Sequence, residues 1–278
     1  MNILISINDG YIKYAKMMLK SLKMSNNVNL DIYLLYDDIT DDNLKDFKEY
    51  VDSEIGTLHA IKFEEDIDFP MNVPHITRET YFRLFAPYIL TDLDRILYLD
   101  CDLIVRMDIS DFYNLKMNDY VIAGAINFDS DNPLYLERLG ISEDHRYINA
   151  GVLLFELNNY RNFITKKEII DYINNNYENL VYQDQDVINY LFRDKIREVG
   201  FTFNYQITQI LDGYEEYGYR IVHFCNKYKP WNDNFRNPDK GKDYYEFLYS
   251  IGEGKEADRL KAIHTENYKS NQTTNEGE

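Results

Sequence analysis

Two aspartates, Asp100 and Asp102, interrupt the otherwise apolar stretch ILYLDCDLIV, which runs from Ile96 to Val105. Burying a carboxylate among apolar side chains is costly unless a cation compensates its charge. Because side chains two residues apart on a strand point the same way, both carboxylates would face one spot. Either one of them is protonated or a cation lies between them, and Mn²⁺ or Mg²⁺ suits oxygen ligands. A strand end that opens into a solvated loop would explain the same tripeptide without a metal.

A third candidate metal ligand, His223, ends a second apolar segment, RIVHF. Imidazole accepts Mn²⁺, so His223 would complete a site with the two carboxylates. Lys229 follows in the segment KPW, and its charge would suit a position beside a diphosphate. Taken alone, His223 fits a structural histidine equally well, and Lys229 fits a solvated surface lysine.

The charge balance narrows the classes of partner. Asp and Glu total 48 against 30 Lys and Arg, which gives a net charge of −18 at pH 7. This balance argues against a nucleic-acid partner and against anionic membrane surfaces, both of which select basic patches. A phosphorylated substrate would need a local cation, and a divalent metal is the obvious one.

Targeting segments, membrane spans and cysteines indicate where in the cell a protein works. The first residues, MNILISINDG, lack the basic start and long apolar run of a signal peptide, and no apolar stretch is long enough for a transmembrane span. The two cysteines, Cys101 and Cys225, imply no disulfide framework. We therefore expect a cytoplasmic protein.

The elements that must position these residues alternate between strand and helix patterns, which predicts an α/β fold with a doubly wound, mainly parallel sheet flanked by helices. Strands are predicted at Asn2–Ile7, Asp31–Asp38, Leu58–Phe63, Ile96–Asp100, Tyr120–Ala125, Gly151–Leu157 and Arg220–Phe224. Helices are predicted around Tyr14–Leu22, from Asp41, at Thr80–Pro87, Lys166–Asn174 and Asp184–Phe192, with a loop at Asn159–Asn162. The two aspartates then lie at the carboxyl end of a strand, which is the edge where open α/β sheets bind ligands.

We divide the chain into three parts. Residues 1–235 are expected to form one catalytic domain, and residues 236–266 a helical C-terminal extension. The last residues, 267–278, are polar and are expected to be disordered.

Six blocks in order resemble the retaining glycosyltransferases of family 8, the group that includes glycogenin and bacterial lipopolysaccharide galactosyltransferases. The blocks cover the chain from Asn2 to about Trp231: NILISINDGYIKYAKMMLKSL, TYFRLFAPYIL, ILYLDCDLIV, YINAGVLLFEL, YQDQDVIN and HFCNKYKPW. The resemblance implies a single A-type glycosyltransferase domain, a Mn²⁺ (or Mg²⁺) cofactor and a UDP-sugar donor. UDP-glucose and UDP-galactose are the expected donors, and a glycan, glycolipid or glycoprotein the expected acceptor.

The same resemblance assigns the metal and nucleotide contacts. Asp100, Asp102 and His223 match the metal ligands that hold the donor diphosphate, and Asp100 also faces the donor. Asn8 and Tyr11 lie where the family binds uracil and ribose.

Other positions match the residues around the donor sugar. Arg83 matches an arginine that contacts the sugar and diphosphate, and Lys229 matches the lysine on the diphosphate. Asp184 and Gln185 match the catalytic pair beneath the anomeric carbon. Three residues match a turn that lines the sugar pocket: Asn149, Ala150 and Gly151.

Four positions depart from the family pattern. Asn8 stands where the first turn usually carries Asp or Thr. Gly10 stands where a polar contact to the nucleotide is common. Asn226 replaces a glycine that lets the backbone approach the phosphate. Asn127 stands where a sugar-contacting acid is expected. We expect residues 225–231 to close over the diphosphate when the donor binds.

Two other classes of function share some of these features. A metal-dependent phosphohydrolase or nucleotidyltransferase would use the same pair of aspartates, but needs neither YQDQD nor HFCNKYKPW. A non-catalytic sugar-nucleotide-binding module would keep the fold, but the intact site residues argue against it. The residues do not decide between a front-face mechanism and a double displacement through Asp184, and they do not predict an oligomeric state.

Overall fold

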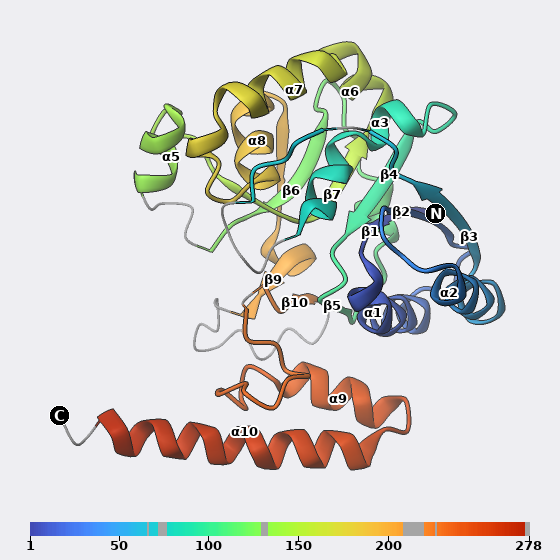
Figure 1. Cartoon of the computed structure of the whole chain (residues 1–278), viewed down its shortest axis with the longest axis vertical. Coiled ribbons are helices and arrows are strands. Elements are labelled where there is room, and N and C mark those ends of the chain that lie inside the picture. Colours follow the sequence, from blue (N-terminus) through green and yellow to red (C-terminus); the bar gives the residue numbers. More distant parts are fainter. Residues whose placement is uncertain (66, 72–76, 129–132, 208–219, 226, 276–278) are drawn as a thin grey trace.

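The computed structural model describes residues 1–65, 67–71, 77–128, 133–207, 220–225 and 227–275 (Figure 1). A seven-stranded sheet forms its middle, with the strand order β3-β2-β1-β4-β7-β6-β8. β7 runs antiparallel to both of its neighbours, β4 and β6, and every other pair is parallel. The predicted α/β fold with a mainly parallel sheet is therefore confirmed. The strands are β1 (Asn2–Ser6), β2 (Asp31–Tyr36), β3 (Thr57–Lys62), β4 (Arg95–Leu99), β6 (Ile122–Ile126), β7 (Ile148–Glu156) and β8 (Ile196–Val199).

Helices cover both faces of this sheet, as Figure 1 shows. The α-helices are α1 (Ile12–Ser25), α2 (Asp41–Glu54), α3 (Ala86–Ile89), α4 (Ser110–Tyr113), α5 (Pro133–Leu139), α6 (Leu157–Phe163), α7 (Lys166–Asn175), α8 (Asp184–Leu191), α9 (Lys242–Ser250) and α10 (Gly254–Asn275). Four short 3-10 helices are η1 (Asp9–Tyr11), η2 (Arg78–Leu84), η3 (Tyr177–Asn179) and η4 (Phe201–Asn204).

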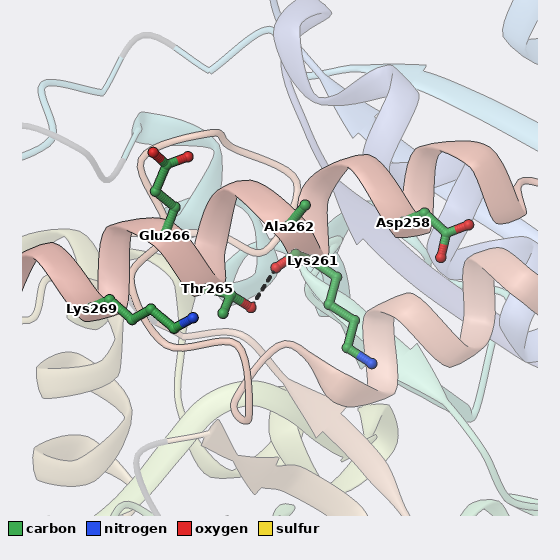
Figure 2. Close-up of a pocket in the computed structure, with 6 residues that line it drawn as sticks. All are labelled: Asp258, Lys261, Ala262, Thr265, Glu266 and Lys269. Carbon is green, nitrogen blue, oxygen red and sulfur yellow. Dashed lines mark hydrogen bonds between the residues drawn. The ribbon is translucent and has the colours of Figure 1, made fainter.

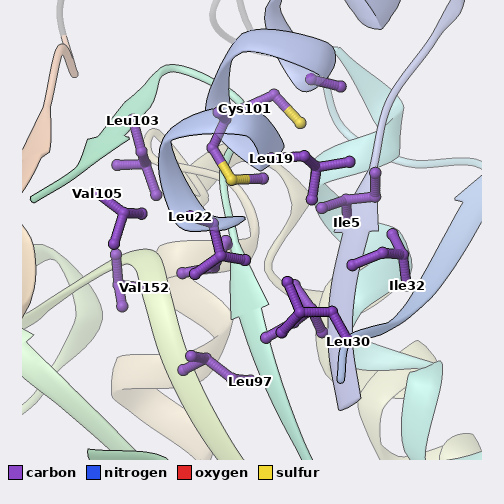
Figure 3. Close-up of a cluster of buried hydrophobic side chains, with 14 of the residues drawn as sticks. Ile5, Leu19, Leu22, Leu30, Ile32, Leu97, Cys101, Leu103, Val105 and Val152 are labelled. Atoms are coloured by element: carbon purple, nitrogen blue, oxygen red, sulfur yellow. The ribbon is translucent and has the colours of Figure 1, made fainter. Parts of the chain in front are cut away.

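The core is split by the sheet into two layers because side chains alternate along each strand. Ile5 and Leu97 pack with α1 and α2 on one face, in the cluster shown in Figure 3. Leu4 and Ile96, their immediate neighbours in the chain, face η2, α6, α7 and α8 on the other. Both faces are therefore buried, which holds the strand ends of the site on a rigid support.

A second, three-stranded sheet has the order β5-β10-β9. Its strands are β5 (Leu103–Val105), β10 (Ile221–His223) and β9 (Tyr205–Gln206). β10 lies antiparallel to β5 with His223 opposite Leu103, and the backbone N–H of Phe224 donates to the carbonyl of Asp102 at 3.0 Å. This pairing brings His223 beside the two aspartates, although the residues are far apart in the chain.

The last two helices pack on this small sheet through an apolar cluster that includes Ile104, Phe224 and Leu260. Polar contacts then fix α10 to the segment after β10. His264 is buried, and its ring nitrogens lie 2.9 Å from the carbonyl oxygen of Asn232 and 2.6 Å from the hydroxyl of Tyr245.

The expected disorder is wrong for residues 267–275, which belong to α10, and residues 276–278 lie outside the described part of the chain. The side-chain amide of Asn267 donates to the carbonyls of Asp233 and Phe235. A polar composition does not reveal such tertiary anchors. The divisions at residues 235 and 266 stay predictions.

Three local predictions also differ from the structure. Asn159–Asn162 belongs to α6 and not to a loop, since Tyr160 is buried and Asn159 donates to two carbonyls. Pro87 does not end a helix but lies in the first turn of α3, where its missing N–H has no partner to lose. Asn149–Gly151 lies within β7 and not in a turn, because the strand begins at Ile148.

Candidate active site

A pocket of about 750 Å³ opens at the carboxyl ends of β1 and β4. Because β7 is antiparallel to β4, it is the beginning of β7 that reaches the same edge. Every predicted site residue in the described part of the chain lines this pocket: Asn8, Tyr11, Arg83, Asp100, Asp102, Asn127, Asn149, Ala150, Gly151, Asp184, Gln185, His223 and Lys229. Asn226 lies outside the described residues.

Asp100, Asp102 and His223 form a cluster whose candidate ligand atoms all lie within 4.8 Å of one another. The Nε2 atom of His223 is 3.3 Å from Oδ1 of Asp102 and 3.8 Å from Oδ2 of Asp100. Two carboxylates and one imidazole are a donor set that Mn²⁺ accepts. The cluster could therefore hold a divalent ion.

Gly151 allows these three groups to converge. A Cβ atom at this position would lie 2.2 Å from Cε1 of His223 and 2.9 Å from Oδ2 of Asp100. Such short contacts are essentially never seen for a real Cβ atom. Any side chain at this position would push His223 and Asp100 away from each other. The bare backbone of β7 thus forms one wall of the cluster.

Lys229 supplies the cation nearest to the cluster. Its Nζ donates to Oδ2 of Asp102 at 2.5 Å and to the carbonyl of Phe224 at 2.6 Å. Burial raises the pKa of Asp102, but the ammonium of Lys229 opposes burial most strongly, and that pKa lies well below its usual range. Burial lowers the pKa of Lys229, but Asp102 raises it by more, so the pKa of this lysine is higher than usual. Both groups are therefore charged near neutral pH.

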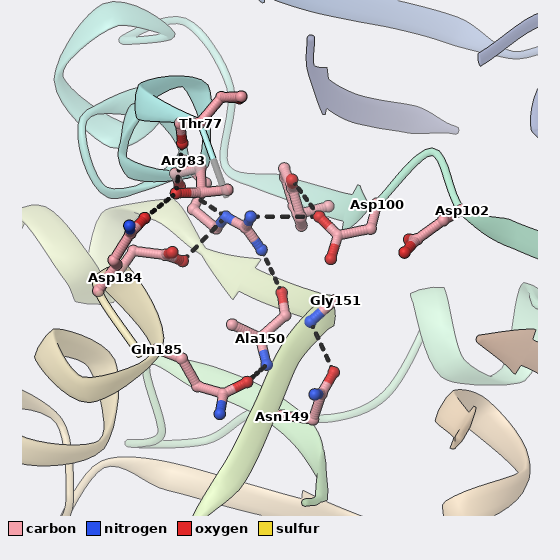
Figure 4. A network of polar contacts seen from close by, with 12 residues as sticks. Thr77, Arg83, Asp100, Asp102, Asn149, Ala150, Gly151, Asp184 and Gln185 are labelled. Atoms are coloured by element: carbon pink, nitrogen blue, oxygen red, sulfur yellow. Dashed lines mark hydrogen bonds and ion pairs between the residues drawn. The ribbon is translucent and has the colours of Figure 1, made fainter. Parts of the chain in front are cut away.

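Arg83 joins the two sides of the pocket, as Figure 4 shows. Only 2% of its side chain is exposed, and its guanidinium lies 3.2 Å from Oδ1 of Asp100 and 3.1 Å from Oδ2 of Asp184. It also donates to the carbonyls of Thr80 and Ala150. Burial lowers the pKa of Arg83, but Asp100 and Asp184 raise it by more than burial lowers it. This arginine therefore stays charged.

Asp184 begins α8 and faces the pocket from beneath Arg83. Burial raises the pKa of its carboxyl to about 6, against a lowering by Arg83. The preceding residue, Gln183, is buried and has φ of 52° and ψ of −122°, a conformation that non-glycine residues rarely adopt. Such backbone strain costs roughly 1–3 kcal/mol and concentrates at functional sites.

Gln185 is held in one orientation by partners on two elements. Its Oε1 accepts from the backbone N–H of Ala150 at 3.0 Å, and its Nε2 donates to the hydroxyl of Tyr147 at 3.3 Å. Tyr147 in turn donates to the fully buried Asp186 at 2.6 Å, and Arg138 pairs with that carboxylate. The amide of Gln185 is therefore presented to the pocket in a fixed direction.

Aromatic rings form another wall of the pocket. Tyr14 stacks on Trp231 with 4.4 Å between ring centroids, and Tyr11 meets Tyr14 edge-on at 5.7 Å. Burial raises the pKa of the Tyr11 hydroxyl, which therefore stays protonated. Such a wall offers stacking area together with hydroxyl groups for a base or a sugar.

Tyr98 was missed in the sequence. Its hydroxyl donates to Oδ1 of Asp100 at 2.5 Å, and the guanidinium carbon of Arg83 lies 3.9 Å from its ring centroid. Strand alternation was a usable signal, since Tyr98 precedes Asp100 by two residues and must point the same way.

A separate hollow lies along the outside of α10 (Figure 2). The bond between the residues drawn runs within the helix, from the hydroxyl of Thr265 to the carbonyl of Lys261. The lining residues follow the spacing of one helix face and contain no convergent chemistry: Asp258, Lys261, Ala262, Thr265, Glu266 and Lys269.

Comparison with known proteins places the chain among sugar transferases. The sequence model described as "Glycosyl transferase family 8" matches residues 2–235. General stress protein A of Bacillus subtilis (strain 168) is 25% identical over 270 residues, which are 90% of this chain and 94% of that protein. A lipopolysaccharide 1,2-glucosyltransferase of Escherichia coli (strain K12) is 25% identical over 248 residues, covering 84% of this chain and 73% of that protein.

The fold has solved counterparts. The crystal structure of the galactosyltransferase LgtC in complex with donor and acceptor sugar analogs superposes with a TM-score of 0.78. The match has 24% sequence identity and covers 90% of this chain and 96% of that one. Within the described ranges, none of the helices is both long enough and apolar enough to cross a bilayer.

Proposed function

The chain belongs to glycosyl transferase family 8, and we propose that it moves a hexose from a UDP-sugar to a carbohydrate-type acceptor, with retention of configuration and with Mn²⁺ (or Mg²⁺) as cofactor. The observation that carries the proposal is the convergence of Asp100, Asp102 and His223 at the edge of one pocket. A cation site beside a pocket wide enough for a nucleotide sugar is what donor binding requires.

The residues present fit a divalent ion. Asp100, Asp102 and His223 would hold it, and the absence of a side chain at Gly151 leaves room for their convergence. When bound, such an ion neutralises the negative charge of the diphosphate and of the leaving group.

Positive side chains of the protein itself would share that task. Lys229 is buried beside Asp102 and would turn its ammonium to the diphosphate once the carboxylate has another partner. Arg83 is fixed by two carboxylates and two carbonyls, so it would present a charge at a constant position. Fixed charges stabilise a developing anion without the cost of reorganising solvent.

Arg83 lies between Asp100 and Asp184. Gln185 and Asp184 would act on the sugar from the side of Arg83 that is away from Asp100. The amide of Gln185 is held by Ala150 and Tyr147, which would keep it beneath the anomeric carbon. The ion pair with Arg83 favours Asp184 as a partner for sugar hydroxyls, in the front-face mechanism where the leaving phosphate takes the acceptor proton. A double displacement would require Asp184 to leave Arg83 and attack that carbon itself.

The sugar and the acceptor are proposed by likeness. The Escherichia coli relative is a lipopolysaccharide 1,2-glucosyltransferase, which favours UDP-glucose as donor and a glycolipid as acceptor, with UDP-galactose as the second donor to test. A cytoplasmic location stays a prediction from the sequence.

A donor screen tests the proposed function. Hydrolysis of UDP-glucose, UDP-galactose and UDP-N-acetylglucosamine is followed with Mn²⁺ and with EDTA, because many transferases slowly hydrolyse their donor without an acceptor. We expect UDP release from either UDP-glucose or UDP-galactose, and only when Mn²⁺ is present. NMR should show that the released sugar keeps the α-configuration. Release of a sugar phosphate instead of UDP would identify a nucleotide-cleaving phosphohydrolase.

A further inference from the structure

Buried side-chain amides run from the pocket to His223 in a fixed order of donors and acceptors. The backbone N–H of Gly151 can only donate, and it donates to Oδ1 of Asn149 at 2.9 Å. The Nδ2 group of Asn204 donates to the same oxygen at 2.8 Å. Oδ1 of Asn204 therefore faces Nδ1 of His223, at 2.9 Å.

This order determines where the proton of His223 lies. An amide oxygen accepts and cannot donate, so Nδ1 of His223 must carry the hydrogen. A neutral imidazole has one N–H, which leaves the lone pair on Nε2. Nε2 is the atom that points to Asp102 and Asp100.

We propose that Asn204 is a positioning residue that fixes the tautomer and the ring orientation of His223, so that Nε2 is ready to bind a metal ion. The inference rests on the proposed function, because it assigns a role within the same metal cluster. Partners behind a metal-binding histidine commonly have this effect.

Burial makes the arrangement rigid. Asn204 has no exposed surface, and Asn149 and His223 are 7% and 3% exposed. Turning the amide of Asn204 would set its NH₂ group against Nδ1–H and its oxygen against Oδ1 of Asn149, with no water to replace the lost bonds. The far end is also bonded, since Nδ2 of Asn149 donates to Oδ1 of Asn127 at 3.1 Å.

The topology explains how Asn204 reaches this place. It ends η4 directly before β9, and β9 pairs in parallel with β10 so that Gln206 lies beside His223. The sequence interval between Asn204 and His223 hides this contact, which only the small sheet creates.

The first test measures the tautomer without any metal. The protein is labelled with ¹⁵N-histidine, treated with EDTA at pH 8, and compared with the His223→Gln variant to assign the signal. We expect the ¹⁵N shifts and proton couplings of His223 to show Nδ1–H. A neutral ring with its hydrogen on Nε2 instead of Nδ1 would overturn the inference.

The second test measures Mn²⁺ affinity by calorimetry, with activity left aside. Asn204→Leu should weaken Mn²⁺ binding by about 10- to 100-fold, the usual effect of losing such a partner. Asn204→Asp keeps an oxygen opposite Nδ1 and should retain the Nδ1–H tautomer. The matched control is Asn26→Ala, which removes a buried amide with three bonds elsewhere in the fold and should leave Mn²⁺ affinity unchanged.

Equal Mn²⁺ affinity for Asn204→Leu and the unaltered protein would contradict the proposed role. Failure of the proposed function is a different result: the unaltered protein would bind no Mn²⁺, while the tautomer measurement would still decide the role of Asn204. Since that measurement uses the unaltered protein, poor folding of a variant does not remove the test.

Discussion

The ammonium of Lys229 lies 2.5 Å from Oδ2 of Asp102, so this lysine neutralises one of the carboxylates that would bind a metal. A divalent ion bound by Asp102 would draw on the same negative charge that holds Lys229 and would weaken that contact. Binding of the ion would therefore release Lys229 toward the diphosphate. In this way an acidic cluster stays stable before either ligand arrives.

Lys229→Ala should have opposite effects on the two ligands. UDP affinity should fall by roughly 1.5–3 kcal/mol, the usual contribution of a charge-assisted hydrogen bond. Mn²⁺ affinity without nucleotide should stay equal or increase, because a competing cation is gone. Calorimetry measures both. Lys20→Ala is the matched control, since Lys20 pairs with Glu54 at 3.2 Å and does not line the pocket. A loss of Mn²⁺ affinity in Lys229→Ala would contradict the competition.

Gln185→Ala should reduce turnover far more than UDP binding, because we propose that the amide lies beneath the sugar and not beside the diphosphate. Tyr147→Phe removes the acceptor for Nε2 of Gln185 and should lower kcat in the same direction, by a smaller factor. Steady-state kinetics and UDP titration separate the two quantities. Equal losses of UDP affinity in Gln185→Ala and Lys229→Ala would refute this division of roles.

Asp102→Asn should give a folded protein in which UDP binding no longer depends on Mn²⁺, because the cluster loses one anionic ligand. Calorimetric titration with Mn²⁺ and with EDTA checks this outcome. Asp108→Asn is a suitable control, as Asp108 is exposed and its carboxylate accepts from the N–H of Ser110. If the unaltered protein bound UDP equally well in EDTA, the metal assignment would be wrong.

Asp184 predicts a pH dependence of stability in metal-free protein. Its pKa is raised from 3.8 to about 6, so its contribution to stability is fully present below 3.8 and is lost as pH rises through 6. Asp184→Asn does not titrate. The free energy of unfolding of this variant, relative to the unaltered protein, should therefore increase between pH 4 and pH 7, by up to about 3 kcal/mol.

Urea unfolding at several pH values measures this difference. The loss of a partner for Arg83 lowers the stability of Asp184→Asn at every pH and does not alter the trend. Asp52→Asn is a control of opposite sign, because a hydrogen bond from Lys48 lowers the pKa of Asp52. A relative stability of Asp184→Asn that is flat with pH would disprove the raised pKa.

Amide hydrogen exchange in residues 227–232 should slow when UDP and Mn²⁺ bind together. Lys229 would exchange a contact with Asp102 for one with the diphosphate, which ties the segment to a bound ligand. Peptides from α2, which contribute nothing to the pocket, serve as the internal control. Unchanged exchange at saturating nucleotide would mean that the segment is already closed without it.

The strand and helix pattern was sufficient to predict six of the seven strands of the main sheet, because buried strands such as Ile96–Leu99 carry their signal locally, but it did not predict the partly exposed β8. The carboxyl-edge rule then placed Asp100 and Asp102 beside the pocket. The family resemblance supplied the partners from distant parts of the chain, and Arg83, Gln185 and Lys229 all line that pocket.

Contacts that depend on short or irregular pairings were not predictable. β5 and β9 have three and two residues, too few for a reliable pattern, yet together with β10, which the strand predicted at Arg220–Phe224 contains, they bring Asn204 and His223 together. The conformation of Gln183 and the anchoring of Asn267 are likewise tertiary effects. Neither leaves a trace in hydrophobic periodicity.

The bonds between α10 and residues 232–235 have a consequence for biosynthesis. A nascent chain emerges N-terminal end first, so the seven-stranded sheet and its two aspartates can form while later residues are still being added. The segment that follows Lys229 has an early partner in Tyr14, on which Trp231 stacks, but its polar contacts with α10 form only later, because His264 binds Asn232 and Arg259 binds Asp233. The support that α10 gives to residues 232–235 is therefore expected to form late in translation, and a chain released before Gly254 would lack it while keeping the aspartates and Lys229.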